Sequence, residues 1–256
     1  MSEIFYLSLF GAGLIFGSFL NVLILRYIPD GALFNFKNLS GRSRCPKCGK
    51  TLCWFELVPV LSFLLLRGKC RSCHDGISIQ YPLIELATGL IFVGVPFLLK
   101  DFLGLEFVLN SKFYILSILW ILVWLSGLVM IVIDFKHYLI PDELNLIILL
   151  SGIFSVFFAI PNDSFLQHYA IIFRFTENVW LNHLLGGTIG ALFFFALYYL
   201  SRGRGMGFGD VKLALAAGIL FGYPDIVMAI ALSFIIGGAW GALLLVFRAK
   251  KIKDRV

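Results

Sequence analysis

The chain has 256 residues, of which 60% are hydrophobic and only 14% are charged. Soluble globular proteins average about half apolar and about a quarter charged residues, and disordered chains are far less hydrophobic. The composition therefore excludes a soluble enzyme and a disordered chain, and it predicts an all-α polytopic membrane protein. The net charge of +6 does not indicate nucleic-acid binding, because no RNA- or DNA-reading module is visible and basic residues of membrane proteins collect in cytoplasmic loops.

A transmembrane helix needs about 20 mostly apolar residues. The sequence predicts about seven transmembrane segments, at residues 4–25, 82–99, 112–133, 139–160, 180–200, 211–222 and 225–247. The sixth is short for a spanning helix, so it is either a half-helix or has a misplaced boundary with the seventh at 222–225. The apolar run 54–66 is also short and contains Glu56 and Pro59, which favours an interfacial or re-entrant segment. Glycines recur four residues apart at Gly13/Gly17, Gly186/Gly190 and Gly237/Gly241, a spacing that predicts close packing of helices.

The basic residues predict the orientation of these segments. With the N-terminus outside and the C-terminus cytoplasmic, 18 of the 21 Lys and Arg residues fall in or beside cytoplasmic loops. The outer loops then hold only Lys100, Lys112 and Arg174, whereas the inverted topology violates the positive-inside bias. The first segment follows an acidic start without Lys or Arg, which predicts a retained anchor and not a cleavable signal peptide.

The one sizeable polar segment, residues 26–81, contains all five cysteines. Four of them form two CxxC pairs, Cys45/Cys48 and Cys70/Cys73. Four thiolates are a ligand set for tetrahedral zinc, and a reducing cytoplasm disfavours the alternative of disulfides. The spacing predicts a structural zinc site in a small cytoplasmic insertion, with no open coordination position for chemistry. Cys53 is outside this pattern. His74, which follows the second pair, is an alternative ligand.

Two aspartates lie at the predicted cytoplasmic edge of the membrane. Asp134 closes the third segment and Asp210 precedes the sixth, in the string GMGFGD. Acidic residues at membrane depth are functional candidates, and two close carboxylates that share a proton can act as general base and general acid, as in aspartic proteases. We expect the glycines before Asp210 to allow an unusual turn. The alternatives are a helix cap for Asp210, a solvated loop position for Asp134 and a cap of the fourth helix for Asp142.

The string GFGD at 207–210 matches the GxGD signature of membrane aspartic proteases. Over about residues 11–245 the sequence resembles the bacterial prepilin peptidases, the type IV leader peptidases. The strings that carry the resemblance are GSFLNV at 17–22, CPKCG at 45–49, PVLS at 59–62, LRGKC at 66–70, YPLIEL at 81–86, GMGFGDVKL at 205–213 and Asp134 with the Pro141-Asp142 pair.

The resemblance implies a bifunctional enzyme of the bacterial inner membrane. Such enzymes cleave the basic leader of type IV prepilins or type II secretion pseudopilins at the cytoplasmic face, and then N-methylate the new terminus with S-adenosylmethionine. It implies that Asp134 and Asp210 are catalytic, and we expect Gly207, Gly209, Asp142 and Lys212 to support their site. The expected partners are these pilin substrates and membrane lipid.

The expected domain order follows from the same resemblance. It comprises a first transmembrane helix at 1–25, a cytoplasmic tetracysteine domain at 26–81 and a transmembrane aspartic peptidase domain at 82–256. Two features depart from the family pattern. Lys136 stands two residues after Asp134, where many members have an acid, and a basic tail at 248–256 stands where many relatives continue into one more helix.

The methyltransferase half rests on the resemblance alone, because no Gly-rich Rossmann-type turn is present. Polar or small residues near the cytoplasmic ends of the first two segments are candidates for a second site, with helix packing and capping as alternatives. They are Gly17, Ser18, Asn21, Glu56 and Glu85. The competing functions are leader cleavage without methylation, or a transporter that uses membrane carboxylates.

Overall fold

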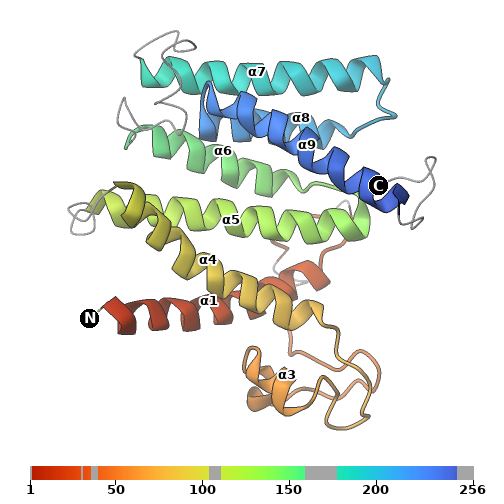
Figure 1. Cartoon of the computed structure of the whole chain (residues 1–256). Coiled ribbons are helices and arrows are strands. Elements are labelled where there is room, and N and C mark those ends of the chain that lie inside the picture. The colour runs from red at the N-terminus through yellow and green to blue at the C-terminus, as the bar shows by residue number, and fades with distance from the viewer. Residues whose placement is uncertain (1, 30, 36–39, 104–110, 159–177, 247–256) are drawn as a thin grey trace. The chain divides into compact units, whose positions relative to one another are not determined.

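The structure, a computed structural model, describes residues 2–29, 31–35, 40–103, 111–158 and 178–246 (Figure 1). These residues are helical, and their only β pairing is two isolated bridges. The all-α prediction is therefore confirmed for the described part of the chain. The predicted outer-loop residue Arg174 and the tail at 248–256 lie outside the described residues. The principal helices are α1 (Ser2–Leu25), α4 (Gln80–Leu103), α5 (Ser111–His137), α6 (Asp142–Val156), α7 (Val179–Leu200), α8 (Phe208–Phe221) and α9 (Asp225–Val246).

Five of these helices, α1, α4, α5, α7 and α9, are long and apolar enough to cross a membrane. They correspond to five of the predicted segments and support a multi-pass membrane protein. The other two predicted segments are shorter: α6 has 15 residues and α8 has 14. The boundary between the sixth and seventh segments lies where the sequence indicated, because α8 ends at Phe221 and α9 begins at Asp225.

The chain divides into two compact units, Met1–Ile147 and Ile148–Val256. In the first unit α1 packs along α4, and α5 lies against both helices (Figure 1). Gly13 and Gly17 make the close approach of α1 possible. A Cβ atom would lie 2.7 Å from the Cα of Gly89 at the first position and 2.7 Å from the Cα of Glu85 at the second. The prediction that this glycine pair serves helix packing is confirmed.

In the second unit α7 packs against α8 in the same way. A Cβ atom at Gly186 would lie 2.5 Å from the carbonyl oxygen of Gly218, and one at Gly190 would lie 2.7 Å from that of Ala214. The corresponding prediction for Gly237 and Gly241 of α9 finds no support in the described residues, because a Cβ atom at either position would meet none of their atoms within 4 Å. Glycine spacing alone does not reveal which face of a helix has a neighbour.

The apolar run 54–66 does not form a spanning helix. It consists of the 3-10 helix η1 (Trp54–Leu57) and the short helix α3 (Leu61–Leu65), separated by a turn at Val58–Val60. Five residues of α3 cover less than two helical turns, so the prediction that this run is not an ordinary transmembrane segment is confirmed.

Candidate functional site

The two CxxC pairs fold into two loops with the same backbone pattern. In the first, the N–H of Cys45 donates to the carbonyl of Lys50, and the N–H of Gly49 donates back to the carbonyl of Cys45, both at 2.9 Å. The second loop has the same two hydrogen bonds: the N–H of Cys70 donates to the carbonyl of Asp75, and the N–H of His74 donates to the carbonyl of Cys70. An isolated β-bridge closes each loop.

The repeated pattern explains two neighbouring residues. Gly49 and His74 occupy the same place in the two loops, and both have positive φ, 70° and 57°. His74 therefore has the same backbone role in the second loop as Gly49 has in the first. Its side chain is not part of the four-cysteine cluster. Cys53 also lies outside the cluster, as predicted, and its N–H donates to the Glu56 carboxylate at 2.8 Å.

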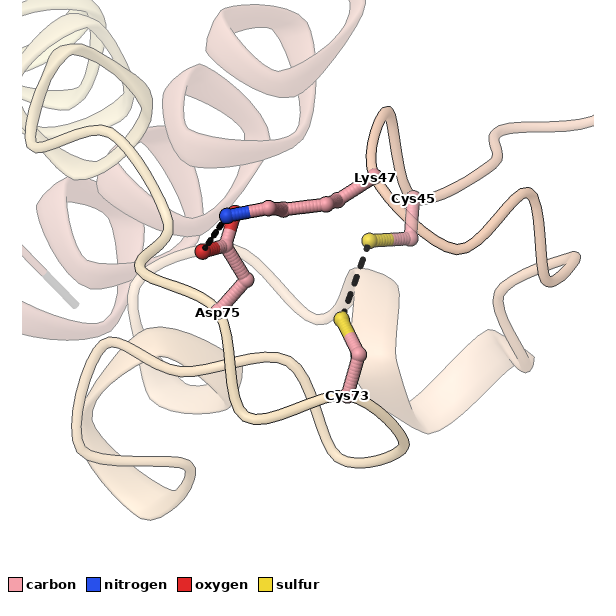
Figure 2. Close-up of polar contacts among 4 residues, drawn as sticks. All are labelled: Cys45, Lys47, Cys73 and Asp75. Carbon is pink, nitrogen blue, oxygen red and sulfur yellow. Dashed lines mark hydrogen bonds and ion pairs between the residues drawn. The ribbon is translucent and has the colours of Figure 1, made fainter.

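Contacts between the loops bring the four thiols together. Lys47 forms an ion pair with Asp75 at 2.8 Å, and Lys50 Nζ donates to Ser72 Oγ at 2.7 Å. Figure 2 shows the Cys45 and Cys73 sulfurs pointing toward one another beside this ion pair. All four cysteine Sγ atoms lie within 4.8 Å of one another.

This geometry suits a tetrahedral metal ion. Zinc–sulfur bonds of about 2.3 Å at tetrahedral angles place sulfurs about 3.8 Å apart, and Cys45 Sγ lies 3.8 Å from Cys73 Sγ. The backbone N–H groups of Cys48 and Lys47 lower the pKa of the Cys45 thiol to about 6. Burial and the neighbouring thiols raise the pKa of Cys73 to about 12, so Cys45 is the thiol of the cluster that most readily forms the thiolate, the form that binds metal. The four cysteines can thus hold a metal ion, and the donor set is one that zinc prefers.

Asp134, the first predicted catalytic residue, lies in the last turn of α5 and is exposed. The dipole of a helix disfavours a negative charge at this end. Within its own unit the Asp134 carboxylate makes no hydrogen bond or ion pair among the described residues. The end of α5 is anchored by His137, whose ring lies 5.7 Å from that of Tyr27, which follows α1. Asp134 is thus held at a fixed helix end with no evident stabilising role of its own.

Asp210, the second predicted catalytic residue, belongs to the other unit and lies in the first turn of α8. Its Oδ2 accepts a hydrogen bond from the N–H of Gly207 at 3.1 Å. An acid at this end of a helix is favoured by the dipole and by capping. Asp210 thus takes part in capping α8, as the third residue of the helix whose carboxylate reaches back to the capping residue Gly207.

The structure also locates the four supporting residues. Asp142 begins α6, and Lys212 of α8 lies with its Nζ 5.7 Å from the centre of the Phe208 ring. Gly207 precedes α8 with an ordinary extended backbone (φ −81°), and Gly209 lies inside the helix. The expectation of an unusual turn at these glycines is wrong: the nearest positive φ values belong to Arg202 and Gly203, which follow the end of α7 at Leu200.

A third cluster joins α1, α4 and the turn before α3. Glu85 Oε2 accepts a hydrogen bond from the backbone N–H of Val60 at 2.8 Å, and Ser18 of α1 lies beside the same carboxylate. Asn21 donates to the backbone carbonyl of Tyr81 at 3.1 Å. The sequence singled out the three polar side chains, but it did not indicate Val60, because a backbone donor leaves no signature in the sequence.

Comparison with known proteins matches two families to successive parts of the chain, and the second match extends over the boundary between the two compact units. Residues 12–98 match the family described as Bacterial Peptidase A24 N-terminal domain, and residues 118–242 match the Type IV leader peptidase family. The prepilin leader peptidase/N-methyltransferase of Vibrio cholerae is 35% identical over 239 residues, which cover 91% of this chain and 85% of the relative. The chain belongs to the type IV leader peptidase family. The family resemblance and the enzyme class predicted from the sequence are confirmed.

Two further relatives bear the same name. The protein of Stutzerimonas stutzeri is 30% identical over 91% of this chain and 78% of its own length. That of Myxococcus xanthus is 30% identical over 94% of this chain, which spans 64% of the length of that relative. No solved structure matches this chain.

Proposed function

We propose that this chain cleaves the basic leader of type IV prepilins or type II secretion pseudopilins at the cytoplasmic membrane face, and then N-methylates the new N-terminus. The observation that carries the proposal is the match to leader peptidase families over both parts of the chain, the second of which includes Asp134 and Asp210. The names of the relatives join the two activities.

We propose Asp134 and Asp210 as the catalytic dyad. One carboxylate, deprotonated, takes a proton from water, and the other, protonated, donates to the carbonyl oxygen of the scissile peptide bond. This chemistry needs no covalent intermediate. Asp134 supports the proposal because the helix dipole disfavours a negative charge at the end of α5. An acid at this position therefore does not stabilise the helix. Asp210 supports it by its place in the GFGD string at the start of α8.

The proposed topology has about seven transmembrane segments in the bacterial inner membrane, with the N-terminus outside and both aspartates at the cytoplasmic edge. The distribution of 18 of 21 basic residues supports this orientation. At that edge a basic leader is attracted by anionic headgroups and by the two carboxylates, while the apolar stretch that follows it remains in the membrane. Water reaches an edge position, which the hydrolysis requires.

We further propose that the cysteine cluster binds one zinc ion, which holds the two loops together and takes no part in the chemistry. Four sulfur ligands leave no position for a substrate water. For S-adenosylmethionine, the support is the name of the relatives. The described residues contain no strand and hence no Rossmann-type turn, so no donor site is assigned and no step is derived through it.

Cleavage of a prepilin in lipid nanodiscs tests the dyad. Asp134→Asn and Asp210→Asn keep the side-chain shape and remove the ionisable acid, and we expect each to lower the cleavage rate by about 10²–10⁴-fold, the usual contribution of a general acid or base. Asp225→Asn, which changes an acid in the first turn of α9, is the matched control and retains the rate. Wild-type cleavage by either test variant, with its fold intact, would exclude the two-carboxylate mechanism.

Transfer of a labelled methyl group from S-adenosylmethionine to the cleaved pilin tests the second activity. We expect label on the new N-terminal amine after incubation with wild-type protein. An unlabelled product, together with no detectable binding of S-adenosylmethionine, would restrict the enzyme to leader cleavage.

A further inference from the structure

A pocket of about 500 Å³ lies between α1 and the segment that contains η1 and α3. On the α1 side it extends from Gly11 to Ser18, a distance of about 10 Å at the rise of an α-helix. Trp54 and Leu57 form part of the facing wall. Ser18 supplies the only hydroxyl group, and the other lining residues are glycine, proline, tryptophan or aliphatic residues. The pocket is therefore an apolar groove with one polar end.

The Glu85 carboxylate lies behind that polar end. It accepts a hydrogen bond from the N–H of Val60, whose neighbours Val58 and Pro59 line the pocket, and it lies beside Ser18. Glu85 is only 6% exposed, and no cation pairs with it in the described part of the chain. A buried carboxylate without a cation is costly, so this site favours a positively charged ligand group.

Two features indicate that the cluster is built for more than packing. Val60 has φ 60° and ψ −49°, a strained conformation for a β-branched residue, and in it the Val60 N–H reaches Glu85. Asn21, one turn from Ser18 on α1, is 1% exposed and leaves its Oδ1 atom without a partner among the described residues. Strain and an unused buried acceptor are typical of binding sites.

We propose that this pocket binds a peptide with a free N-terminal ammonium followed by apolar residues, which is the cleaved pilin if the function proposed above is correct. Glu85 and Ser18 receive the ammonium group, and the apolar residues lie along α1 toward Gly11. The site is thus the acceptor site for methylation, formed by residues that the peptidase mechanism does not use.

The chemistry of the pocket disfavours two other occupants. A phospholipid would bring an anionic phosphate close to a buried carboxylate. A nucleoside such as that of S-adenosylmethionine carries many hydrogen-bonding atoms, and the apolar walls leave most of them without partners.

Binding of labelled peptides to the full chain in nanodiscs tests the proposal. The probe is a peptide with a free N-terminal Phe followed by apolar residues, and its N-acetylated form is the reference. We expect wild-type protein to bind the free amine at least about tenfold more tightly, as for a charged hydrogen bond. Glu85→Gln keeps an oxygen for the Val60 N–H and should bind both peptides equally. Glu143→Gln removes an acid that accepts one backbone N–H from Leu33 and should keep the preference.

A second pair of variants tests the groove itself. A side chain at Gly11 enters open space beside the pocket, so Gly11→Phe should fill the groove and weaken both peptides without disturbing the fold. Gly127→Phe on α5 also enters open space, away from the pocket, and should bind as wild type. Equal binding of the two peptides by wild type, a preference that survives Glu85→Gln, or unweakened binding by Gly11→Phe would each overturn the proposal.

Leader cleavage and methylation by the same proteins separate this inference from the proposed function. We expect Glu85→Gln to cleave the leader at the wild-type rate, which also reports that it is folded. A wild-type protein that cleaves and methylates but shows no Glu85-dependent preference would refute the acceptor site alone. A wild-type protein with neither activity would refute the proposed function, whatever the peptides show.

Discussion

The cysteine island, residues 40–79, and the α7–α8 pair hold together by opposite means: the island has no apolar core, whereas the helix pair buries small and aliphatic residues of α8. Within the island only Cys45, Glu56 and Cys70 are buried, and two of these are candidate metal ligands. The buried residues of α7 are three glycines, Gly186, Gly187 and Gly190. With the zinc ion proposed above, the island depends on cross-linking through sulfur, whereas the helix pair depends on the close approach of two backbones.

The difference follows from the predicted solvent of each region. In water a short, loop-rich segment buries too little apolar surface to fold by itself, and the proposed zinc ion would replace the missing core. Between membrane helices the hydrophobic effect provides no driving force, and close van der Waals packing at small residues takes its place. Removing the metal ligands should therefore unfold the island and leave the α7–α8 pair intact. Disturbing the glycine contacts should destabilise the helix pair and leave the island intact.

The largest expected effect is the loss of a metal ligand. Cys70→Ser should reduce the zinc content from one per chain to near zero and open residues 40–79 to protease, because structural zinc contributes about 10–16 kcal/mol of apparent folding energy in small peptides. Protection of α7 and α8 from hydrogen exchange should not change. Cys53→Ser, outside the cluster, is the control and keeps its zinc. Unaltered protease resistance after Cys70→Ser and chelator would show that the island folds without metal.

A smaller effect is expected from an added methyl group between α7 and α8. In Gly186→Ala the new Cβ meets backbone atoms of Gly218 and Gly222 at 2.5–2.8 Å, and neither can move aside as a side chain would. Overpacking of this kind costs about 1–3 kcal/mol, which should lower the thermal midpoint in nanodiscs and leave the zinc content unchanged. Gly237→Ala makes the same change in open space on α9. Equal midpoints for the two variants would show that the packing of α7 on α8 tolerates a side chain.

The smallest effect concerns the start of α7. The Asn178 side chain accepts hydrogen bonds from the N–H groups of Trp180 and Leu181, at 3.1 and 3.4 Å. Replacing such a cap by alanine costs about 1 kcal/mol. Asn178→Ala should therefore speed hydrogen exchange in the first turn of α7, and Asn178→Asp, which retains an acceptor, should restore it. Identical exchange in all three proteins would show that packing on α8 alone determines where α7 begins.

Much of the architecture was predictable because it depends on local composition. Five predicted segments correspond to helices long enough to span a membrane, and the boundary at 222–225 lies between α8 and α9 as indicated. The CxxC spacing predicted a cluster that the structure forms. The glycine patterns were informative only in part, since Gly13 and Gly186 have close neighbours while Gly237 and Gly241 have none among the described residues.

The rest depends on contacts between residues that are distant in the sequence. The hydrogen bond from Val60 to Glu85 joins a turn of the insertion to α4, and neither its donor nor the conformation of Val60 has a sequence signature. The same holds for the bond from the Leu33 N–H to Glu143, which ties the start of the insertion to α6. Asp210 was correctly anticipated as a cap candidate, but only the structure shows which N–H it receives.

The sequence by itself determined the membrane class, the place of the five long apolar helices, the two CxxC pairs and the family, because hydropathy, cysteine spacing and short motifs are properties of contiguous residues. Only the tertiary structure decided which glycines are close contacts and which are open. It also decided that two loops converge into one sulfur cluster, and that a buried carboxylate closes the end of an apolar groove. These features arise where separate segments meet, and the free energy of such contacts depends on partners that no local pattern specifies.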